Sequence, residues 1–527
     1  MTIPTARIIK ELSRPEAYPH QVDTVKLIQT HISIIFIAGE LVYKIKKPVD
    51  LGFLDFTTLE KRLHFCKEEL RLNRRLSPEI YLDVVSVIDG PEGLSIPGPV
   101  VSETAVEYAV VMKKLDETRM LSSLLLEGSV EKAALRSIAT RIARFHSEAE
   151  TSSYINKTGG TEAVIFNTEE DFQQIEPFIG NTLSRKTFEK IVGYTRTFLE
   201  VNRNLFLARE ADGWIRDGHG DLHTQHICMT NGIQIFDCIE FNDRFRYGDI
   251  LVDAAFLTMD LERLGFKDLA DEFTTFYLKQ MKQEEYKGLF NFYTCYRAVV
   301  RGKVEGFRSR DPNIKQAEAR AARENARNFF HLGEKYSRTL VPPVLITGCG
   351  LMGSGKSTLA EALKEYLDIT ILASDSIRKE LAGIDPLSSH HVPFGSDIYS
   401  KEFSRRTYSR MHERAMTCLK EGQSVFLDAS YMSPDLRAQA METARKADAG
   451  FLLLHLDSTE EELIKRLRKR RKDSGVISDG REEILGEQTK AFSPPVEVTG
   501  EQKLILSCLH PLDHRVRETY RRLLATT

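Results

Sequence analysis

A glycine-rich segment in the last third of the chain, Gly350–Ser357, most strongly limits what this sequence can fold into. It has the pattern G-x-x-x-x-G-K-S, follows a strand-like run at 344–348 and opens a helical pattern at 356–367. Glycines let backbone N–H groups face a phosphate, and the helix N-terminus adds a favourable dipole. In such a loop Lys356 reaches the β- and γ-phosphates, and the Ser357 hydroxyl holds Mg²⁺. The predicted nucleotide-binding residues are Gly350, Gly353, Ser354, Gly355, Lys356, Ser357 and Thr358.

Short β-branched runs alternate with helical patterns throughout the region 342–527. Strands separated by helices pair in parallel and form an α/β layer structure. The sequence therefore predicts a P-loop domain over 342–527 with a five-stranded parallel sheet. Its expected strands are 344–348, 369–373, 424–428, 451–456 and 503–507.

Two aspartates follow strands of this predicted sheet, at the edge where ligands bind in open α/β folds. Asp375 begins a D-x-x-R pattern that ends in Arg378, so the carboxylate can accept a proton from an attacking hydroxyl and the arginine can hold an anionic group. The alternative is that Asp375 caps the helix at 376–382. Asp428 ends a later strand, where it either orients metal-bound water or caps the strand.

Basic residues crowd one predicted helix, at 459–472. Arg466 and Arg470 are spaced to lie on one face of it, where they can close over a transferring phosphoryl group as a lid. A solvated charged face and a nucleic-acid patch are the alternatives.

These residues resemble the P-loop kinases of small molecules and polynucleotides, a group that includes adenylyl-sulfate kinase, gluconate kinase, zeta-toxin-type kinases and polynucleotide 5′-kinases. The resemblance covers about 344–510. It implies that Asp375 is the general base and that Arg378 binds the acceptor.

The region before the P-loop reads as a separate domain at 1–335. A polar-faced helix at 312–330 is expected to stop at Gly333, and Pro342-Pro343 follows. The residues up to about 113 mix strands with one strong helix at 58–76. The remainder is mostly helical, except for a strand–loop–strand region around 214–241, so an α+β lobe followed by a larger helical lobe is predicted.

The strand–loop–strand region carries a second phosphotransferase signature. The segment His219–His223 reads H-G-D-L-H, and a strand at 233–236 then ends in Asp237. Asp221 can accept a proton and Asp237 can hold Mg²⁺. The pattern resembles the aminoglycoside phosphotransferase and choline kinase family and implies a bilobal, protein-kinase-like fold. The same resemblance identifies Lys44 as the ATP lysine.

Other residues of the first domain extend that resemblance. Glu69 matches the partner of the ATP lysine, and Gly248, Asp249 and Asp253 match the G-D-x-x-x-D that supports the catalytic loop. Lys46 shares a strand face with Lys44, so either lysine can be the inward one.

One position departs from the family. The metal-binding asparagine expected five residues after Asp221 is His226, and Mg²⁺ prefers oxygen ligands. Asp237 can alternatively be a buried cap. Arg297 and Arg301 share a helix face and either bind an acidic substrate or pair with internal acids such as Asp253.

Composition limits the remaining classes of function. The 527 residues have a formal net charge of −3, so a strongly basic nucleic-acid binder is not expected. Seven cysteines without C-x-x-C spacing suit a reducing cytosol, apolar runs are shorter than a membrane span, and residues 1–11 lack the apolar core of a secretion signal.

The sequence as a whole resembles bacterial fusions of the two kinase types. It predicts a cytoplasmic, bifunctional phosphotransferase that uses ATP and Mg²⁺ and phosphorylates hydroxyl groups of small metabolites such as sugars or nucleotide-sugars. In one alternative the first domain is a ligand-binding regulator of the second. In the other, the second domain phosphorylates polynucleotide 5′ ends.

Overall fold

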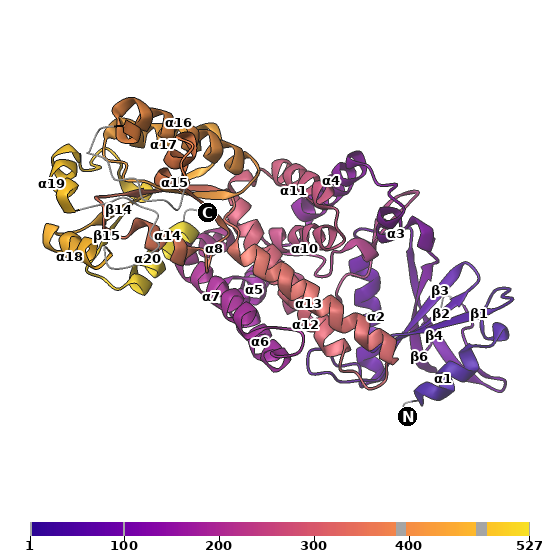
Figure 1. The fold of residues 1–527 in the computed structure, drawn as a ribbon. Coiled ribbons are helices and arrows are strands. Elements are labelled where there is room, and N and C mark those ends of the chain that lie inside the picture. The colour runs from indigo at the N-terminus through magenta and orange to yellow at the C-terminus, as the bar shows by residue number, and fades with distance from the viewer. Residues whose placement is uncertain (1–2, 99–100, 386–396, 471–481, 526–527) are drawn as a thin grey trace. The chain divides into compact units, whose positions relative to one another are not determined.

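The computed structural model describes residues 3–98, 101–385, 397–470 and 482–525. The chain divides into two compact units (Figure 1). The first comprises 1–173, 204–284 and 296–301, and the second comprises 174–203, 285–295 and 302–527.

The first unit begins with a six-stranded antiparallel sheet in the order β1-β2-β3-β6-β4-β5. Successive side chains of a strand point to opposite faces. Tyr43 and Ile45 of β3 therefore pack on the face with α1, while Lys44 and Lys46 point to the face with α2. The elements are α1 (Thr5–Leu12), β1 (Val25–Gln29), β2 (Ser33–Ala38), β3 (Leu41–Lys46), α2 (Leu59–Asn73), β4 (Tyr81–Gly90), β5 (Gly93–Ser95) and β6 (Ala105–Lys113).

The larger lobe of this unit is helical and contains two small antiparallel ladders, β7 with β10 and the hairpin β8 with β9. Helix α10 is buried along most of its length and contacts α11, which in turn contacts α4. The elements are α3 (Leu121–Leu126), α4 (Lys132–Glu148), α5 (Ser153–Gly159), α6 (Thr161–Ile175), α8 (Arg203–Ala211), β7 (Ile215–Asp217), β8 (Ile227–Thr230), β9 (Gly232–Ile235), α9 (Asp243–Arg246), β10 (Tyr247–Asp249), α10 (Ile250–Arg263) and α11 (Lys267–Met281).

The second unit contains α7 (Arg185–Val201), α13 (Gln316–Arg338) and most of α12 (Lys287–Arg308). The prediction that helix α13 ends at Gly333 is wrong, because this helix continues to Arg338. Gly333 is buried in the helix, and its carbonyl accepts a hydrogen bond from Cys295 Sγ at 3.3 Å. Packing against α12 therefore outweighs the low helix propensity of glycine.

A five-stranded, all-parallel sheet completes this unit, in the order β12-β13-β11-β14-β15. All five predicted strands are confirmed, as is the α/β fold of the P-loop domain. The elements are β11 (Val344–Cys349), α14 (Lys356–Leu363), β12 (Ile369–Ala373), α15 (Ser374–Leu381), α16 (Lys401–Lys420), β13 (Ser424–Asp428), α17 (Pro434–Lys446), β14 (Gly450–Asp457), α18 (Glu460–Arg470), α19 (Glu482–Ala491), β15 (Lys503–Ser507) and α20 (Leu512–Ala525).

Two further observations bear on the sequence-based expectations. All seven cysteines are free thiols. Within the described residues, the model contains no helix whose length and apolar character suit a membrane crossing.

Candidate active sites

A buried aspartate holds the loop of the first candidate site in place. Asp253, on α10, accepts hydrogen bonds from the backbone N–H of His219 at 2.5 Å and of Gly220 at 2.9 Å. Gly220 has φ +85°, and a Cβ there would lie 2.8 Å from the carbonyl oxygen of Phe245. Glycine is therefore needed at this close approach. The loop backbone is fixed, and Asp221 follows it directly.

Lys44 and Lys46 both point inward, and one carboxylate connects them. Glu69 Oε1 lies 2.8 Å from Lys44 Nζ, and Glu69 Oε2 lies 2.7 Å from Lys46 Nζ. Lys44 Nζ also donates to Asp237 Oδ1 at 2.8 Å. Lys46 Nζ instead pairs with Glu240. Lys44 is thus the lysine that joins the sheet to the predicted metal ligand, whereas Lys46 belongs to a buried ion pair behind it.

Burial and the opposite charges in this network both shift the pKa values of its members. Burial opposes the charged form of Lys44, but Asp237 and Glu69 outweigh it and raise the lysine's pKa. Burial also opposes ionisation of Glu69, yet Lys44 and Lys46 lower its pKa. Burial raises the pKa of Glu240 more than Lys46 lowers it.

Hydrogen bonds determine which ring nitrogen of His226 carries the proton. His226 Nδ1 lies 2.9 Å from the backbone carbonyl oxygen of Asp221. A carbonyl can only accept, so Nδ1 is the donor and the neutral ring keeps a lone pair on Nε2. That lone pair lies 3.5 Å from Asp237 Oδ2. Burial lowers the pKa of His226, and the nearby His223 lowers it further.

His223 has the opposite arrangement. Its Nδ1 accepts from the backbone N–H of Gln225 at 3.3 Å, so Nε2 carries the proton and faces Asp221 Oδ2 at 3.4 Å. Burial favours the neutral form of Asp221, but His223 and His226 outweigh it and hold the pKa of this carboxyl below its usual range. Asp221 is therefore an ionised carboxylate, oriented by a histidine, that can accept a proton.

The neighbouring arginines Arg297 and Arg301 both interact with internal acids. Arg297 is buried, lies 3.9 Å from Asp253 Oδ1 and stacks over Phe256 at 4.8 Å. It is part of the internal ion-pair network. Arg301 instead contributes to lowering the pKa of Asp221.

The second candidate site is the P-loop at the carboxyl end of β11. Lys356 Nζ donates to the backbone oxygens of Gly350 and Leu351, each at 2.9 Å. Gly350 has φ +144°, and a Cβ there would lie 2.8 Å from the carbonyl oxygen of Leu456, so this position requires glycine. Ser357 and Thr358 are exposed in the first turn of α14.

Three residues from distant parts of the chain support this loop. The sequence predicted a role for only one of them, Arg466. Gln488 Oε1, on α19, accepts from the N–H of Met352 at 2.7 Å. Cys508 Sγ donates to Ser354 O at 2.8 Å, and Arg466 donates to Cys508 O at 2.5 Å. The predicted lid residue Arg466 therefore lies at the loop. The sequence feature that could have predicted a role for Cys508 is its position directly after β15, at the edge of the sheet where ligands bind.

The predicted base, Asp375, and the predicted metal residue, Asp428, act electrostatically on the loop lysine. Asp375 lies in the first turn of α15, whose N-cap is Ala373, so Asp375 is not the capping residue. Burial lowers the pKa of Lys356, while Asp428 and Asp375 counteract that effect. Both carboxylates thus favour the charged form of Lys356.

Arg378 has protein partners. It is buried, and it donates to the carbonyl oxygen of Ile398 at 2.7 Å and to Ser404 Oγ at 3.0 Å. Its guanidinium also lies 4.8 Å from the ring of Tyr399. Its contact with an acceptor stays a prediction. The side chain of Arg470 lies outside the described residues.

Comparisons with known proteins give matches to different parts of the chain. A family model described as AAA domain matches residues 345–495. A cytidylate kinase of Pectobacterium atrosepticum is 32% identical over 145 residues, which cover 27% of this chain and 58% of that protein. The crystal structure of a choline/ethanolamine kinase family protein from Mesorhizobium loti is 12% identical with a TM-score of 0.37, and the match covers 63% of this chain and 97% of that one.

The uncharacterized protein Rv2004c of Mycobacterium tuberculosis is similar over both units. It is 31% identical over 457 residues, which cover 86% of this chain and 88% of that protein. The chain belongs to the same family as this mycobacterial protein, and it carries a P-loop domain at its carboxyl-terminal end.

Proposed function

We propose that this ATP-dependent kinase is bifunctional, with one phosphotransferase site in each unit. Each site transfers the γ-phosphoryl group of ATP to a hydroxyl group of a small metabolite, of the sugar or nucleotide-sugar class. The observation that carries the proposal is the connected Lys44–Glu69–Asp237 network beside Asp221, since it supplies the first unit with every role that phosphoryl transfer requires.

In the first site the reaction uses two carboxylates. Asp221 accepts the proton of the acceptor hydroxyl as its oxygen bonds to the γ-phosphorus, and the bond to the leaving ADP breaks. Lys44, held by Glu69, binds the phosphates. Asp237 offers a partly exposed carboxylate to the metal, and bound Mg²⁺ neutralises charge on the phosphates.

In the second site Lys356 turns from the loop carbonyls to the phosphates, and Asp375 is the base. Ser357 and Asp428 provide the oxygen donors that Mg²⁺ prefers. These residues fit the metal that their family uses. Arg378 and Arg466 place positive charge at this end of the sheet, which favours an anionic acceptor.

An ATP-consumption screen of metabolite pools tests the proposal. The full chain, Asp221→Asn and Asp375→Asn are compared on the same pools. We expect each variant to lose a different subset of acceptors. The bifunctional proposal is wrong if Asp221→Asn consumes ATP with every pool at the rate of the unmodified chain while Asp375→Asn is inactive.

Full ATP consumption by Asp221→Asn with an inactive Asp375→Asn would instead indicate that the first unit is a regulator, which is the second candidate function for it. The observation in its favour is the nitrogen donor of His226 at a position that faces the metal-binding carboxylate of Asp237. A regulator binds nucleotide or metabolite at the first site without turnover, so ligand binding to the Asp375→Asn protein distinguishes it from an empty fold.

A further inference from the structure

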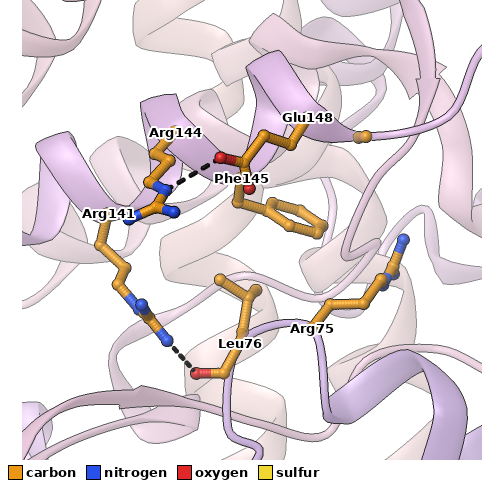
Figure 2. Close-up of a pocket in the computed structure, with 7 residues that line it drawn as sticks. Arg75, Leu76, Arg141, Arg144, Phe145 and Glu148 are labelled. Carbon is orange, nitrogen blue, oxygen red and sulfur yellow. Dashed lines mark hydrogen bonds and ion pairs between the residues drawn. The ribbon is translucent and has the colours of Figure 1, made fainter.

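A basic pocket of about 350 Å³ lies in the first unit. Figure 2 shows the side chains of Arg75, Arg141 and Arg144 around it, with Phe145 and Glu148 completing the wall. Neither Asp221 nor Asp237 lines it. Three guanidinium groups against one lining carboxylate make the pocket attractive to anions.

The three arginines differ in how many of their donors are used. Arg75 is committed to structure, because it donates to the carbonyl oxygens of Asp217 and Gly218, both at 2.8 Å, and to Leu72 O at 3.0 Å. Its guanidinium stacks on Phe145 at 4.9 Å. It therefore forms one wall of the pocket and contributes charge more than free N–H groups.

Arg141 and Arg144 retain donors. Arg141 gives one hydrogen bond, to Leu76 O at 2.7 Å, and its buried Nε has no hydrogen-bond partner among the described residues. An unpartnered buried N–H is costly unless a ligand or water satisfies it. Arg144 is exposed and pairs through Nε with Glu148 Oε1 at 2.9 Å, which leaves the other edge of its guanidinium available.

Both residues lie on α4, three positions apart, and so share one face of the helix. They also line an adjoining depression of about 530 Å³ beside the turn between β8 and β9. Together the two hollows have room for a small molecule on either side of an anionic group. Arginine forks match the oxygens of a phosphoryl group, and a dianion best balances two guanidinium groups.

We propose that this pocket is a second ligand site of the first unit, which binds a small molecule carrying a phosphoryl group and holds that group between Arg141 and Arg144. None of its lining residues belongs to either candidate nucleotide site. The pocket is linked to the proposed catalytic loop through Arg75. This residue of the pocket wall donates to the backbone carbonyls of the two residues that precede His219.

Inorganic phosphate is the probe, and the full chain is used with a non-hydrolysable ATP analogue and Mg²⁺ at saturation so that both nucleotide sites are filled. Isothermal titration is expected to give one phosphate per chain. Arg144→Gln is expected to weaken binding about tenfold, because a charge-assisted contact is lost. Glu148→Gln is expected to tighten it, because Arg144 is released from its partner.

Arg136→Gln and Glu272→Gln provide matched controls. Arg136 lies on the same helix and pairs with Glu272 at 2.5 Å, but neither residue lines the pocket. Arg136→Gln changes the net charge as Arg144→Gln does, and Glu272→Gln changes it as Glu148→Gln does. Both controls are expected to leave phosphate binding unchanged. Absence of phosphate binding by the unmodified chain, or equal weakening by Arg136→Gln and Arg144→Gln, would overturn the proposal. Arg144 is exposed, so its variant is expected to fold normally.

Discussion

The position of a single proton on His226 sets the character of the first site. With Nδ1 donating to the carbonyl of Asp221, an Nε2 lone pair faces Asp237 Oδ2 at 3.5 Å. Two acceptors facing one another in a half-buried site are poorly placed unless a cation lies between them. Imidazole nitrogen suits Mn²⁺ or Zn²⁺ better than Mg²⁺, so a metal bound there by both atoms is held by a mixed N and O donor set.

The first prediction concerns this donor set. His226→Asn exchanges the nitrogen donor for an amide oxygen, and we expect the preference of the first site for Mn²⁺ over Mg²⁺ to fall about tenfold. This metal preference is measured by titrating metal into the Lys356→Ala chain with a bound ATP analogue. Electron paramagnetic resonance of Mn²⁺ monitors the binding. Asp237→Ala is the control and is expected to weaken both metals. An unchanged Mn²⁺ preference in His226→Asn would show that Nε2 is not a ligand.

The second prediction separates the base from the binding residues. Asp221→Asn keeps the shape of the side chain but removes the proton acceptor, so kcat at the first site is expected to fall about 10²–10⁴-fold. The affinity for ATP is expected to stay the same, because Lys44 and Asp237 remain. Parallel loss of kcat and ATP affinity would instead indicate that Asp221 binds the metal or the nucleotide.

At the scale of elements, the catalytic loop depends on α10 and on the strand that precedes Asp237. Asp253 holds the loop from α10, and His219 Nε2 donates to the carbonyl oxygen of Phe236 at 3.0 Å. These side-chain-to-backbone hydrogen bonds keep the loop and the proposed metal ligand Asp237 in register.

Gly220→Ala tests this register. The new Cβ would clash with the Phe245 carbonyl at a backbone angle that alanine disfavours, so activity at the first site is expected to fall at least tenfold. Gly232→Ala is the matched control, since it also has positive φ, +99°, but nothing lies within 4 Å of its Cβ. We expect it to lower the melting temperature slightly and to retain activity. Equal activity of both variants would contradict the close approach.

His219 gives the fold a pH dependence. Burial lowers its pKa from 6.5 to about 4, so the folded state keeps the ring neutral while the unfolded state takes up a proton below pH 6.5. The contribution of His219 is therefore fully present above pH 6.5 and is lost progressively as the pH falls toward 4, by about 3 kcal/mol in total. Urea unfolding at pH 7 and pH 4.5 measures this, with His219→Gln as comparison. The same loss of stability in both proteins would assign the effect to other groups.

Local patterns predicted the elements of the P-loop domain well, because each buried parallel strand is a continuous apolar run between helices. Helix α20 was missed, since Arg515, Arg521 and other charges obscure the stripe formed by Val516, Tyr520 and Leu524. The end of α13 was placed wrongly, because burial of Gly333 depends on α12. The partners Glu240, Gln488 and Cys508 lie far along the chain from the residues they hold, and no local pattern connects them.

At the scale of the whole molecule, the chain carries two candidate sites of different architecture, and the described residues assigned to each site belong to one unit. The first unit uses an antiparallel sheet that presents Lys44 and a helix that presents Glu69. The second uses the carboxyl edge of a parallel sheet. In the proposed function the two sites bind phosphates through different residues, so each nucleotide site can be removed while the other is left intact.

The number of nucleotides bound per chain tests the central claim most directly. Equilibrium dialysis of the full chain with a non-hydrolysable ATP analogue and Mn²⁺ is expected to give two per chain. Lys356→Ala and Lys44→Met are each expected to give one, and the double variant none, with circular dichroism confirming that all four proteins are folded. A stoichiometry of one in the unmodified chain that Lys44→Met leaves unchanged would contradict the account, because the first unit would then have no nucleotide site.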